Sequence, residues 1–287
     1  MLLKGRNAIV TGGSRGLGKA IAQAFLTNGA NVAICGREPA NLKTAVKELQ
    51  PHSISKESLY AVGADVSREN DVKYLVESVL DKFGRLDIVV NNAAILGPIG
   101  ESETVDWQEW QRTLEINLGG TMLLCRAAIP LFKKQKRGKI INLSGGGATS
   151  ARPRFSAYAV SKAALVRLTE NLAEELKDYN VDVNAIAPGA FQSDMLEEIL
   201  KAGPDRVGAK AYEQAKKGDT TGSMERAAAL CVFLASEATD SITGKLISAI
   251  WDPWQSLPKH KEHLRDSDLY TLRRIVPSDR GLNWEES

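Results

Sequence analysis

Short apolar runs alternate along the chain with longer stretches in which apolar residues recur at helical spacing. The short runs are rich in strand-forming residues and predict seven strands, at residues 7–11, 31–35, 59–64, 86–90, 139–143, 181–187 and 246–250. The longer stretches are amphipathic and predict helices, at residues 18–28, 41–50, 70–83, 107–134, 157–179 and 225–235. This alternation predicts a series of βαβ units.

Several predicted strands are apolar on both faces, as at residues 87–90 and 139–142. Such strands suit a parallel sheet covered by helices on both sides, and right-handed crossovers then give a doubly wound α/β fold. No internal repeat, low-complexity tract or Pro/Ser-rich linker precedes Ile250. We therefore expect one domain over residues 1–250, followed by a C-terminal tail, residues 251–287, that packs on the domain or on a neighbouring subunit.

The charge and cysteine content exclude several classes of partner. Lys and Arg number 37 against 35 Asp and Glu, and a net charge of +2 is too small to attract nucleic acid or an anionic membrane. Cys35, Cys125 and Cys231 each sit in an apolar run, which predicts buried free thiols in a reducing compartment, the cytoplasm. No apolar stretch approaches the ~20 residues of a spanning helix, so we expect neither secretion nor membrane insertion.

The first predicted strand runs into a glycine-rich turn, Thr11-Gly-Gly-Ser-Arg-Gly-Leu-Gly18, and then into a helix. Glycines there let the backbone approach a phosphate at the helix N-terminus, so we expect a pyrophosphate site rather than a turn without a ligand. The same segment has the frame of an ATPase phosphate loop, Gly13-x-x-x-x-Gly18-Lys19. Ala20 follows where that motif needs a hydroxyl for magnesium, which argues against ATP hydrolysis.

The end of the second strand bears on the choice of cofactor. It reads Cys35-Gly36-Arg37, with no carboxylate where NAD sites hold the ribose hydroxyls. Arg37 and Arg15 are placed to pair with a 2′-phosphate, which favours NADP(H) over NAD(H), although each arginine alone is typical of a solvated surface. Asp65, at the end of the third strand, either bonds the adenine amino group or caps the next helix.

A tyrosine and a lysine stand four residues apart in the fifth predicted helix, at Tyr158 and Lys162. This spacing places the phenol and the ammonium on one helix face. A free phenol titrates near ~10, and a fixed cation lowers that pKa, so Tyr158 is a candidate general acid/base with Lys162 as its tuner. Taken alone, a Tyr and a Lys at this spacing are more often an ordinary pair on a helix face than a catalytic pair.

Taken together, the motifs resemble the short-chain dehydrogenase/reductase family, and they occur in the family's order across residues 5–250. The glycine turn resembles the family's cofactor turn, Asn91-Asn-Ala-Ala94 its fourth-strand motif, and Tyr158-x-x-x-Lys162 its catalytic pair. Pro188-Gly189 followed by Ser193 is similar to the segment that contacts the nicotinamide, where the family more often has threonine. Asn117 takes the place of a helix asparagine that supports a water and proton relay.

This resemblance implies a single Rossmann domain with strand order 3-2-1-4-5-6-7, oxidoreductase activity, and a homodimer or homotetramer. It also implies the residues that contact the cofactor: Gly12, Ser14, Arg15, Gly16, Leu17, Gly18, Arg37, Asp65, Val66, Asn91, Ala93, Tyr158, Lys162, Pro188, Gly189 and Ser193.

The chain departs from the family after the fifth strand. The family usually has Asn-x-Ser-Ser, with the second serine about thirteen residues before the tyrosine, whereas this chain has Asn142-Leu-Ser144-Gly145. We expect a loop longer by one residue to let Ser144 bond the substrate oxygen, with Ser150 as a weaker substitute. The predicted catalytic residues are therefore Asn117, Ser144, Tyr158 and Lys162.

In the predicted reaction a carbonyl between Ser144 and Tyr158 receives hydride and takes the tyrosine proton, and alcohol oxidation is the reverse. Arginines near Tyr158 and in the tail favour a small polar substrate, acidic or sugar-like, although a solvated surface charge is the alternative for each; they are Arg152, Arg154, Arg273, Arg274 and Arg280. The alternatives are a catalytically silent NADP(H)-binding sensor or scaffold, which Gly145 keeps open, and a nucleotide-sugar epimerase, for which the chain has too little sequence.

Two weaker signals carry no predicted chemistry. His260 and His263, with Glu262 between them, lack the further ligands that a structural zinc needs, so no metal is predicted. Four tryptophans are interpreted as packing or interface residues: Trp107, Trp110, Trp251 and Trp254.

Overall fold

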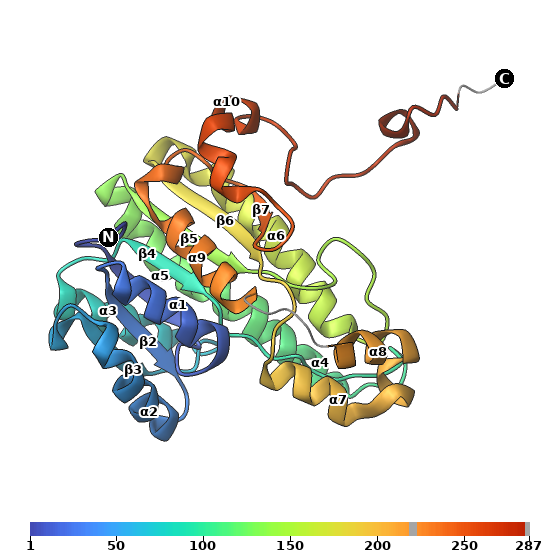
Figure 1. Ribbon diagram of the computed structural model, residues 1–287, viewed down its shortest axis with the longest axis horizontal. Helices are drawn as coiled ribbons and strands as arrows, with labels where there is room; N and C mark the ends of the chain where they lie inside the picture. Colours follow the sequence, from blue (N-terminus) through green and yellow to red (C-terminus); the bar gives the residue numbers. More distant parts are fainter. Residues whose placement is uncertain (218–222, 285–287) are drawn as a thin grey trace.

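The computed structural model describes residues 1–217 and 223–284, which form a parallel sheet between two layers of helices (Figure 1). The strands are β1 (Asn7–Thr11), β2 (Asn31–Gly36), β3 (Leu59–Gly63), β4 (Ile88–Asn91), β5 (Gly138–Leu143), β6 (Val181–Ala187) and β7 (Leu246–Ser248). All six pairings are parallel, in the order β3-β2-β1-β4-β5-β6-β7. The predicted doubly wound α/β fold is confirmed, and so is the predicted order of its strands.

Alternate residues of each strand pack into two separate cores, one on each face of the sheet. Ala8, Val10 and Ile88 join the core beneath α1 (Gly16–Thr27), α2 (Pro39–Leu49) and α9 (Ser223–Ala235). Ile9 and Val89 point the other way, against α3 (Glu69–Phe83), α5 (Gly120–Gln135) and α6 (Ser156–Leu176). Because successive strand side chains alternate, strands covered on both faces must be apolar throughout.

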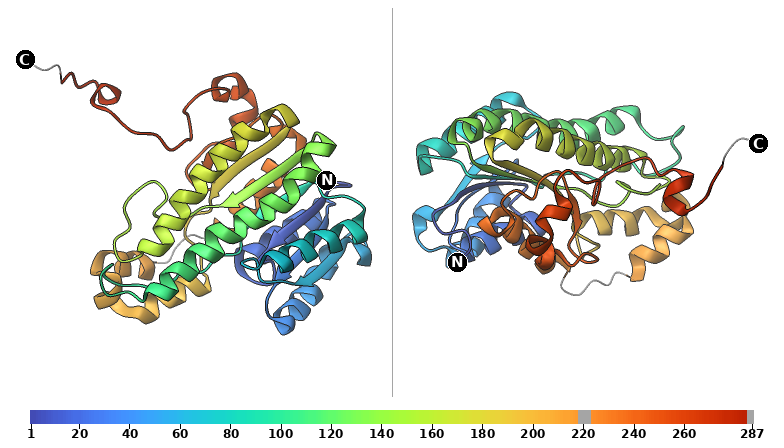
Figure 2. Two further views of the ribbon diagram at one scale, coloured as in Figure 1. Left: turned by 180° about the vertical axis from the view of Figure 1, so that it is seen from behind. Right: turned by 90° about the horizontal axis from the view of Figure 1, so that it is seen from above.

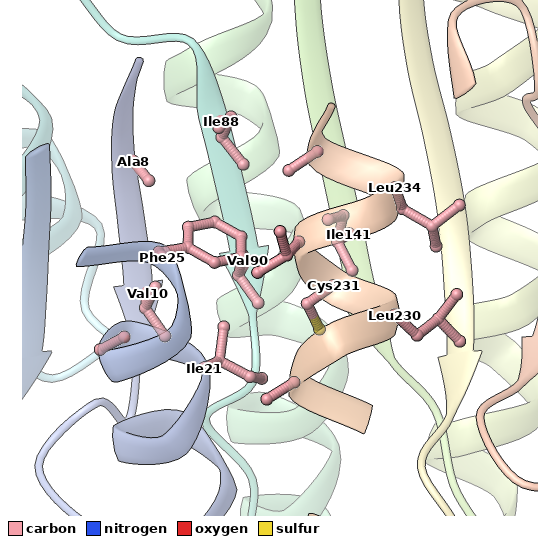
Figure 3. Packing of buried hydrophobic residues seen from close by; sticks show 14 of the residues in the cluster. Ala8, Val10, Ile21, Phe25, Ile88, Val90, Ile141, Leu230, Cys231 and Leu234 are labelled. Carbon is pink, nitrogen blue, oxygen red and sulfur yellow. The ribbon is translucent and has the colours of Figure 1, made fainter. Parts of the chain in front are cut away.

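Figure 3 shows the first of these cores from close by. Phe25 and Ile21 of α1 and Cys231 of α9 lie over the side chains of β1, β4 and β5, and all three are fully buried. The three cysteines are buried free thiols, as predicted. Burial raises the pKa of each thiol, so none is a reactive thiolate near neutral pH.

The helix predicted over residues 107–134 is divided into three parts. It consists of α4 (Trp107–Leu114), a π-helical turn (Glu115–Gly119) and α5. The Asp106 carboxylate caps α4 by accepting from the Glu109 amide at 2.8 Å. The π turn widens the helix at Asn117, a distortion that is frequent at functional sites.

Two helices between β6 and α9 were not predicted. They are α7 (Asp194–Val207), which is kinked at Gly203 and Pro204, and α8 (Ala209–Lys217). Of the α7 residues only Ile199 and Val207 are buried, and α8 buries none, so both helices lie mostly at the surface. Both lie beyond the carboxyl end of β6, beside Leu96, Phe155 and Tyr158.

The segment after β7 packs on the domain and then leaves it. Trp254, Leu257 and Leu264 are buried in the core of α1 and α9, and the short helix α10 (Lys261–Leu264) ends this part. The Leu246 amide of edge strand β7 donates to the Tyr270 carbonyl at 2.8 Å, which covers the sheet edge there. Beyond Leu272 the chain extends away from the body (Figure 2).

Among the described residues, no helix is long and apolar enough to cross a membrane. The same residues contain no group of three or more His, Cys, Asp or Glu side chains placed to hold a metal ion.

Replacing Trp254 by Ala should destabilise the fold by about 3–5 kcal/mol, because the indole is 6% exposed and packs on Phe233 with ring centroids 5.3 Å apart. Trp251→Ala is the matched control, since Trp251 is 85% exposed, and should change stability by less than about 0.5 kcal/mol. Urea unfolding of the two variants measures the difference. Equal effects of the two substitutions would mean that the segment after β7 does not belong to the core.

Candidate active site

A cleft of about 340 Å³ runs along the carboxyl edge of the sheet, where the open end of a doubly wound fold binds ligands. Most of the residues predicted from the sequence line it: Gly12, Ser14, Arg15, Gly16, Leu17, Gly18, Arg37, Asp65, Val66, Ala93, Ser144, Tyr158, Lys162, Pro188 and Ser193. Asn91, Asn117 and Gly189 are not part of the lining.

The glycine turn between β1 and α1 has the geometry that a bound pyrophosphate needs. Gly12 and Gly16 have φ of 63° and 51°, in the left-handed region that favours glycine. A Cβ on Gly18 would lie 2.3 Å from the Gly12 carbonyl oxygen, so only glycine lets the turn close on the helix. A Cβ on Gly16 would meet no atom within 4 Å, so the turn is open on that side. The turn therefore fits a dinucleotide phosphate at the start of α1.

The loop after β4 holds this turn in place through Asn92, which the sequence did not single out. The Asn92 side-chain amide donates to the Thr11 carbonyl at 2.9 Å, and the amides of Asn92 and Ala93 donate to Thr11 Oγ1 at 3.0 Å. Asn91, the neighbour predicted to contact the cofactor, is 5% exposed and donates to Asn142 Oδ1 of β5 at 2.8 Å. Asn91, the last residue of β4, therefore ties β4 to β5, while Asn92, in the loop that follows, lines the cleft.

The far end of the cleft lies at the tip of β2. Ser14 Oγ is 3.3 Å from the position that a Cβ on Gly36 would occupy, and Arg37 follows with an exposed side chain. Arg15 is also exposed and forms an ion pair with Asp194 of α7. Ser14 and Arg37 thus share the strand tip, whereas the Arg15 guanidinium already has a carboxylate partner.

Asp65 is held by its own turn. Its Oδ1 accepts from the Ser67 amide and hydroxyl at 3.0 and 2.7 Å, and its Oδ2 pairs with Arg112 at 3.1 Å. Partial burial alone would raise the pKa of Asp65, but the Ser67 hydrogen bonds and the Arg112 charge lower it overall. The α3 N-cap is Arg68, so Asp65 fixes the turn before the helix and does not cap it.

Tyr158 and Lys162 lie on the first turns of α6, facing the end of β5. Both are buried, at 9% and 3% exposure. The Lys162 ammonium donates to the Leu143 carbonyl at 2.7 Å and lies 5.5 Å from the centroid of the Tyr158 ring. The predicted proximity of phenol and ammonium is therefore present, with the lysine anchored to the last residue of a central strand.

Burial dominates the titration of this pair. It raises the pKa of Tyr158, an effect that the positive charge of Arg152 partly offsets, and it lowers the pKa of Lys162 to about 8. The sequence predicted a lowered pKa for the Tyr158 phenol, whereas its environment in the structure raises this pKa. The physical reason is desolvation, which disfavours the charged form of either group.

Asn117 acts below the cleft, between the β4 loop and α6. Its side-chain amide donates to the Ile95 carbonyl and to Ser161 Oγ, both at 3.0 Å, and its Oδ1 accepts from the Ile95 amide at 2.9 Å. It is 1% exposed. Asn117 thus ties the loop after β4 to the helix that bears Tyr158 and Lys162.

Comparison with known proteins identifies the fold and the chemistry together. A family model described as short chain dehydrogenase matches residues 6–203. The chain belongs to the short-chain dehydrogenase/reductase family. It is an NAD(P)-dependent oxidoreductase that acts on CH–OH groups.

The enzyme's relatives act on different alcohols. An L-fucose dehydrogenase of Bos taurus is 36% identical over 240 residues, which cover 82% of this chain and 84% of the relative. A 3beta-hydroxysteroid dehydrogenase of Eggerthella lenta is 37% identical over 244 residues, covering 84% and 91%. A solved short-chain dehydrogenase/reductase from Mycobacterium ulcerans superposes with a TM-score of 0.76 at 30% identity, covering 86% and 89%.

The departure at Gly145 has a structural consequence in this enzyme. A Cβ on Gly145 would lie 2.6 Å from the Tyr158 hydroxyl, so the phenol occupies the space that the family's usual serine would take. Ser144 lines the cleft, is 3% exposed, and has its Oγ 3.5 Å from the Lys162 carbonyl. Its role as hydrogen-bond donor to the substrate remains a prediction.

Residues from the segment after β6 complete the cleft. Phe191, Met195 and Glu198 line it together with the predicted Pro188 and Ser193. Ser193 caps α7 by accepting from the Leu196 amide at 3.3 Å. Gly189, with φ of 87°, turns the chain from β6 toward this helix. The Pro-Gly signal located the segment, but it did not indicate which of the following side chains face the cleft.

Gly145→Ala should lower kcat by about tenfold or more, because the added methyl forces the Tyr158 hydroxyl to move. Gly146→Ala is the matched control, since its Cβ would first meet the flexible Arg152 side chain at 3.5 Å. Steady-state kinetics compares the two variants, and cofactor titration verifies that both still bind the dinucleotide. A fully active Gly145→Ala enzyme would contradict the tight contact.

The lowered pKa of Lys162 predicts a pH-dependent contribution to stability. The unfolded chain retains the lysine proton up to the ordinary pKa of 10.5, whereas the folded protein releases it at about 8. The free energy of unfolding of the wild type, relative to Lys162→Met, should therefore rise between pH 8 and 10.5 and be constant below 8. Urea unfolding of both proteins over this pH range measures the difference in their free energies of unfolding. A difference that stays constant or falls would contradict the lowered pKa of Lys162.

Proposed function

We propose that the enzyme interconverts a carbonyl and a secondary alcohol on a small polar substrate, acidic or sugar-like, with NADP(H) as the hydride carrier. The observation that carries this proposal is the buried Tyr158–Lys162 pair, which lines the same cleft as the glycine turn. A dinucleotide with its phosphates at the turn can reach the tyrosine along that cleft.

Each side chain has a distinct task in the proposed reaction. The bound cofactor supplies or accepts the hydride. Tyr158 donates its hydroxyl proton to the substrate oxygen during reduction and takes it back during oxidation. Lys162 places a positive charge beside the phenol, and Ser144 donates a hydrogen bond to the same oxygen. Asn117 holds the loop after β4 against α6. Its role in a water and proton relay, which the family resemblance implies, stays a prediction.

The tip of β2 supports NADP(H) over NAD(H). Gly36 has no side chain, and the tip lies beside a hydroxyl, Ser14, and a guanidinium, Arg37. A 2′-phosphate accepts hydrogen bonds from such groups, and Arg pairs with it bidentately. Glu38, the residue after Arg37, also lines the cleft and is a carboxylate near the tip of β2, so NAD(H) is the alternative cofactor.

Two observations support a polar substrate. The L-fucose dehydrogenase relative is named for a sugar, which extends by proposal to this enzyme. The second is Arg152, whose Cζ lies 5.4 Å from the Tyr158 ring centroid. Of the other arginines considered for an acidic group, Arg154 already pairs with Glu101 at 2.7 Å and Arg273 with Asp279 at 2.8 Å. The steroid dehydrogenase relative keeps a neutral apolar alcohol as the competing substrate class.

We also propose a cytoplasmic homodimer or homotetramer that binds neither nucleic acid nor membrane. The buried free thiols suit a reducing compartment, and a net charge of +2 gives no attraction for polyanions. The tail beyond Leu272 is proposed to reach a neighbouring subunit. Assembly of the family into multimers supports the oligomer.

The competing function is a silent NADP(H)-binding sensor, which Gly145 favours because the usual serine hydroxyl is missing. Hydride-transfer assays on ketones, sugars, acidic sugars and the corresponding alcohols, with NADPH or NADP⁺, separate the two. We expect turnover that Tyr158→Phe abolishes without loss of cofactor binding. Cofactor binding without turnover on any of these substrates would establish the sensor.

Arg37→Gln should weaken NADPH binding by about ten- to a hundredfold, the effect of removing a hydrogen bond to a charged group, and leave NADH binding nearly unchanged. Fluorescence titration with both cofactors measures this, and NADH provides the internal control. Equal effects on the two cofactors would locate Arg37 away from the 2′-phosphate and favour NAD(H).

A further inference from the structure

The Arg152 side chain has an unusual environment for a guanidinium. It is partly buried, and its Cζ lies 4.2 Å from the Phe155 ring centroid and 5.4 Å from that of Tyr158. Within residues 1–217 and 223–284, no carboxylate lies within ion-pair distance of it and no hydrogen bond holds it. Arg154, two residues later, instead pairs with Glu101 and donates to the Asp205 carbonyl.

Two cations thus lie near the Tyr158 ring at nearly equal distances: Lys162 on the same helix and Arg152 in the loop before it. The Lys162 ammonium lies 5.5 Å from its ring centroid and the Arg152 guanidinium 5.4 Å. Apolar side chains pack around the ring, among them Leu96, Phe155 and Ile199, and Tyr158 is 9% exposed. At such a buried site a positive charge acts more strongly on a phenolate than it would in water.

Carboxylates lie farther along the cleft, on α7. Asp194 is paired with Arg15, and Glu198 lines the cleft with a pKa that burial raises. Neither is among the charges that shift the titration of Tyr158, which is affected by burial and by Arg152. Among residues 1–217 and 223–284, the positive charges near the phenol therefore have no carboxylate partner in an ion pair.

The glycines of the β5–α6 loop make room for this arrangement. Gly145 faces the Tyr158 hydroxyl, and a Cβ on Gly146 would lie 3.5 Å from Arg152 Nη1. A Cβ on Gly147 would lie 3.3 Å from the Cβ of Arg152 and 2.6 Å from that of Ala159. A side chain at Gly145 would crowd the phenol and one at Gly147 would crowd the start of α6, whereas one at Gly146 would make ordinary contact with the guanidinium.

We propose that Arg152 is a second cation beside Tyr158 and that its charge stabilises the phenolate form of Tyr158. Arg152 is a positioning residue in this role, since it acts through Tyr158. The inference rests on the proposed function for its kinetic consequence, but the charge state of Tyr158 is measurable without any substrate.

The first test is a tyrosinate titration by ultraviolet absorbance of the full-length protein. Subtracting the titration of the matching Tyr158→Phe protein isolates the Tyr158 signal in the wild type and in each variant. Arg152→Gln should move it to higher pH by about one to two pH units, because a charge about 5 Å away is lost in a partly buried site. Arg152→Lys should retain part of the effect, and Arg154→Gln, the matched control, should have none.

The second test is the pH profile of alcohol oxidation on a substrate found in the assays above. Arg152→Gln should shift the rising limb of kcat to higher pH in parallel with the titration and lower kcat near neutrality by about tenfold or more. Partial rescue by Arg152→Lys shows that the loss follows charge and not misfolding.

An unchanged Tyr158 titration in Arg152→Gln overturns the proposal, whatever the enzyme's activity. A raised KM confined to anionic substrates, with the pH profile unchanged, would also overturn it and assign Arg152 to substrate binding. If no substrate turns over, the proposed function fails, yet a shifted titration still supports the second cation. The two failures are therefore distinguishable.

Discussion

One buried hydrogen bond, from the Lys162 ammonium to the Leu143 carbonyl at 2.7 Å, connects the chemistry of this enzyme to its fold. Leu143 ends a central strand, and Lys162 lies on the helix that carries Tyr158, so the bond fixes the phenol relative to the carboxyl edge of the sheet. A buried ammonium without an acceptor would be costly, which makes the position of α6 specific. The glycine turn opens onto the same edge, and a bound dinucleotide is thereby directed toward the tyrosine.

The surroundings of Tyr158 balance desolvation against positive charge. Burial alone would keep the phenol neutral at high pH, which suits proton donation but opposes proton abstraction. The charge of Arg152 counters this, and the glycines of the β5–α6 loop leave the space that the Tyr158 and Arg152 side chains need. Gly145 therefore does more than remove a serine hydroxyl. It leaves room for the Tyr158 phenol, which occupies the space of a serine side chain at this position.

Much of this was predictable from the sequence because its physical causes are local. Strands apolar on both faces predicted the parallel sheet, and the Tyr158–Lys162 spacing predicted their shared helix face. The helices α7 and α8 were missed because they contribute nothing to the two main cores and pack instead beside Leu96, Phe155 and Tyr158. Asn91 was chosen in place of Asn92 because the sequence does not show that β4 ends between them. The direction of the Tyr158 titration depends on tertiary burial, which the spacing of Tyr158 and Lys162 does not reveal.

The most direct test of the account is a crystal structure of the enzyme with NADPH. We predict the phosphates at the glycine turn, the 2′-phosphate between Ser14 and Arg37, and the nicotinamide ring beside the Tyr158 hydroxyl, with the Lys162–Leu143 hydrogen bond intact. A nicotinamide bound away from Tyr158 would contradict the account, because the buried pair would then have no hydride donor to work with.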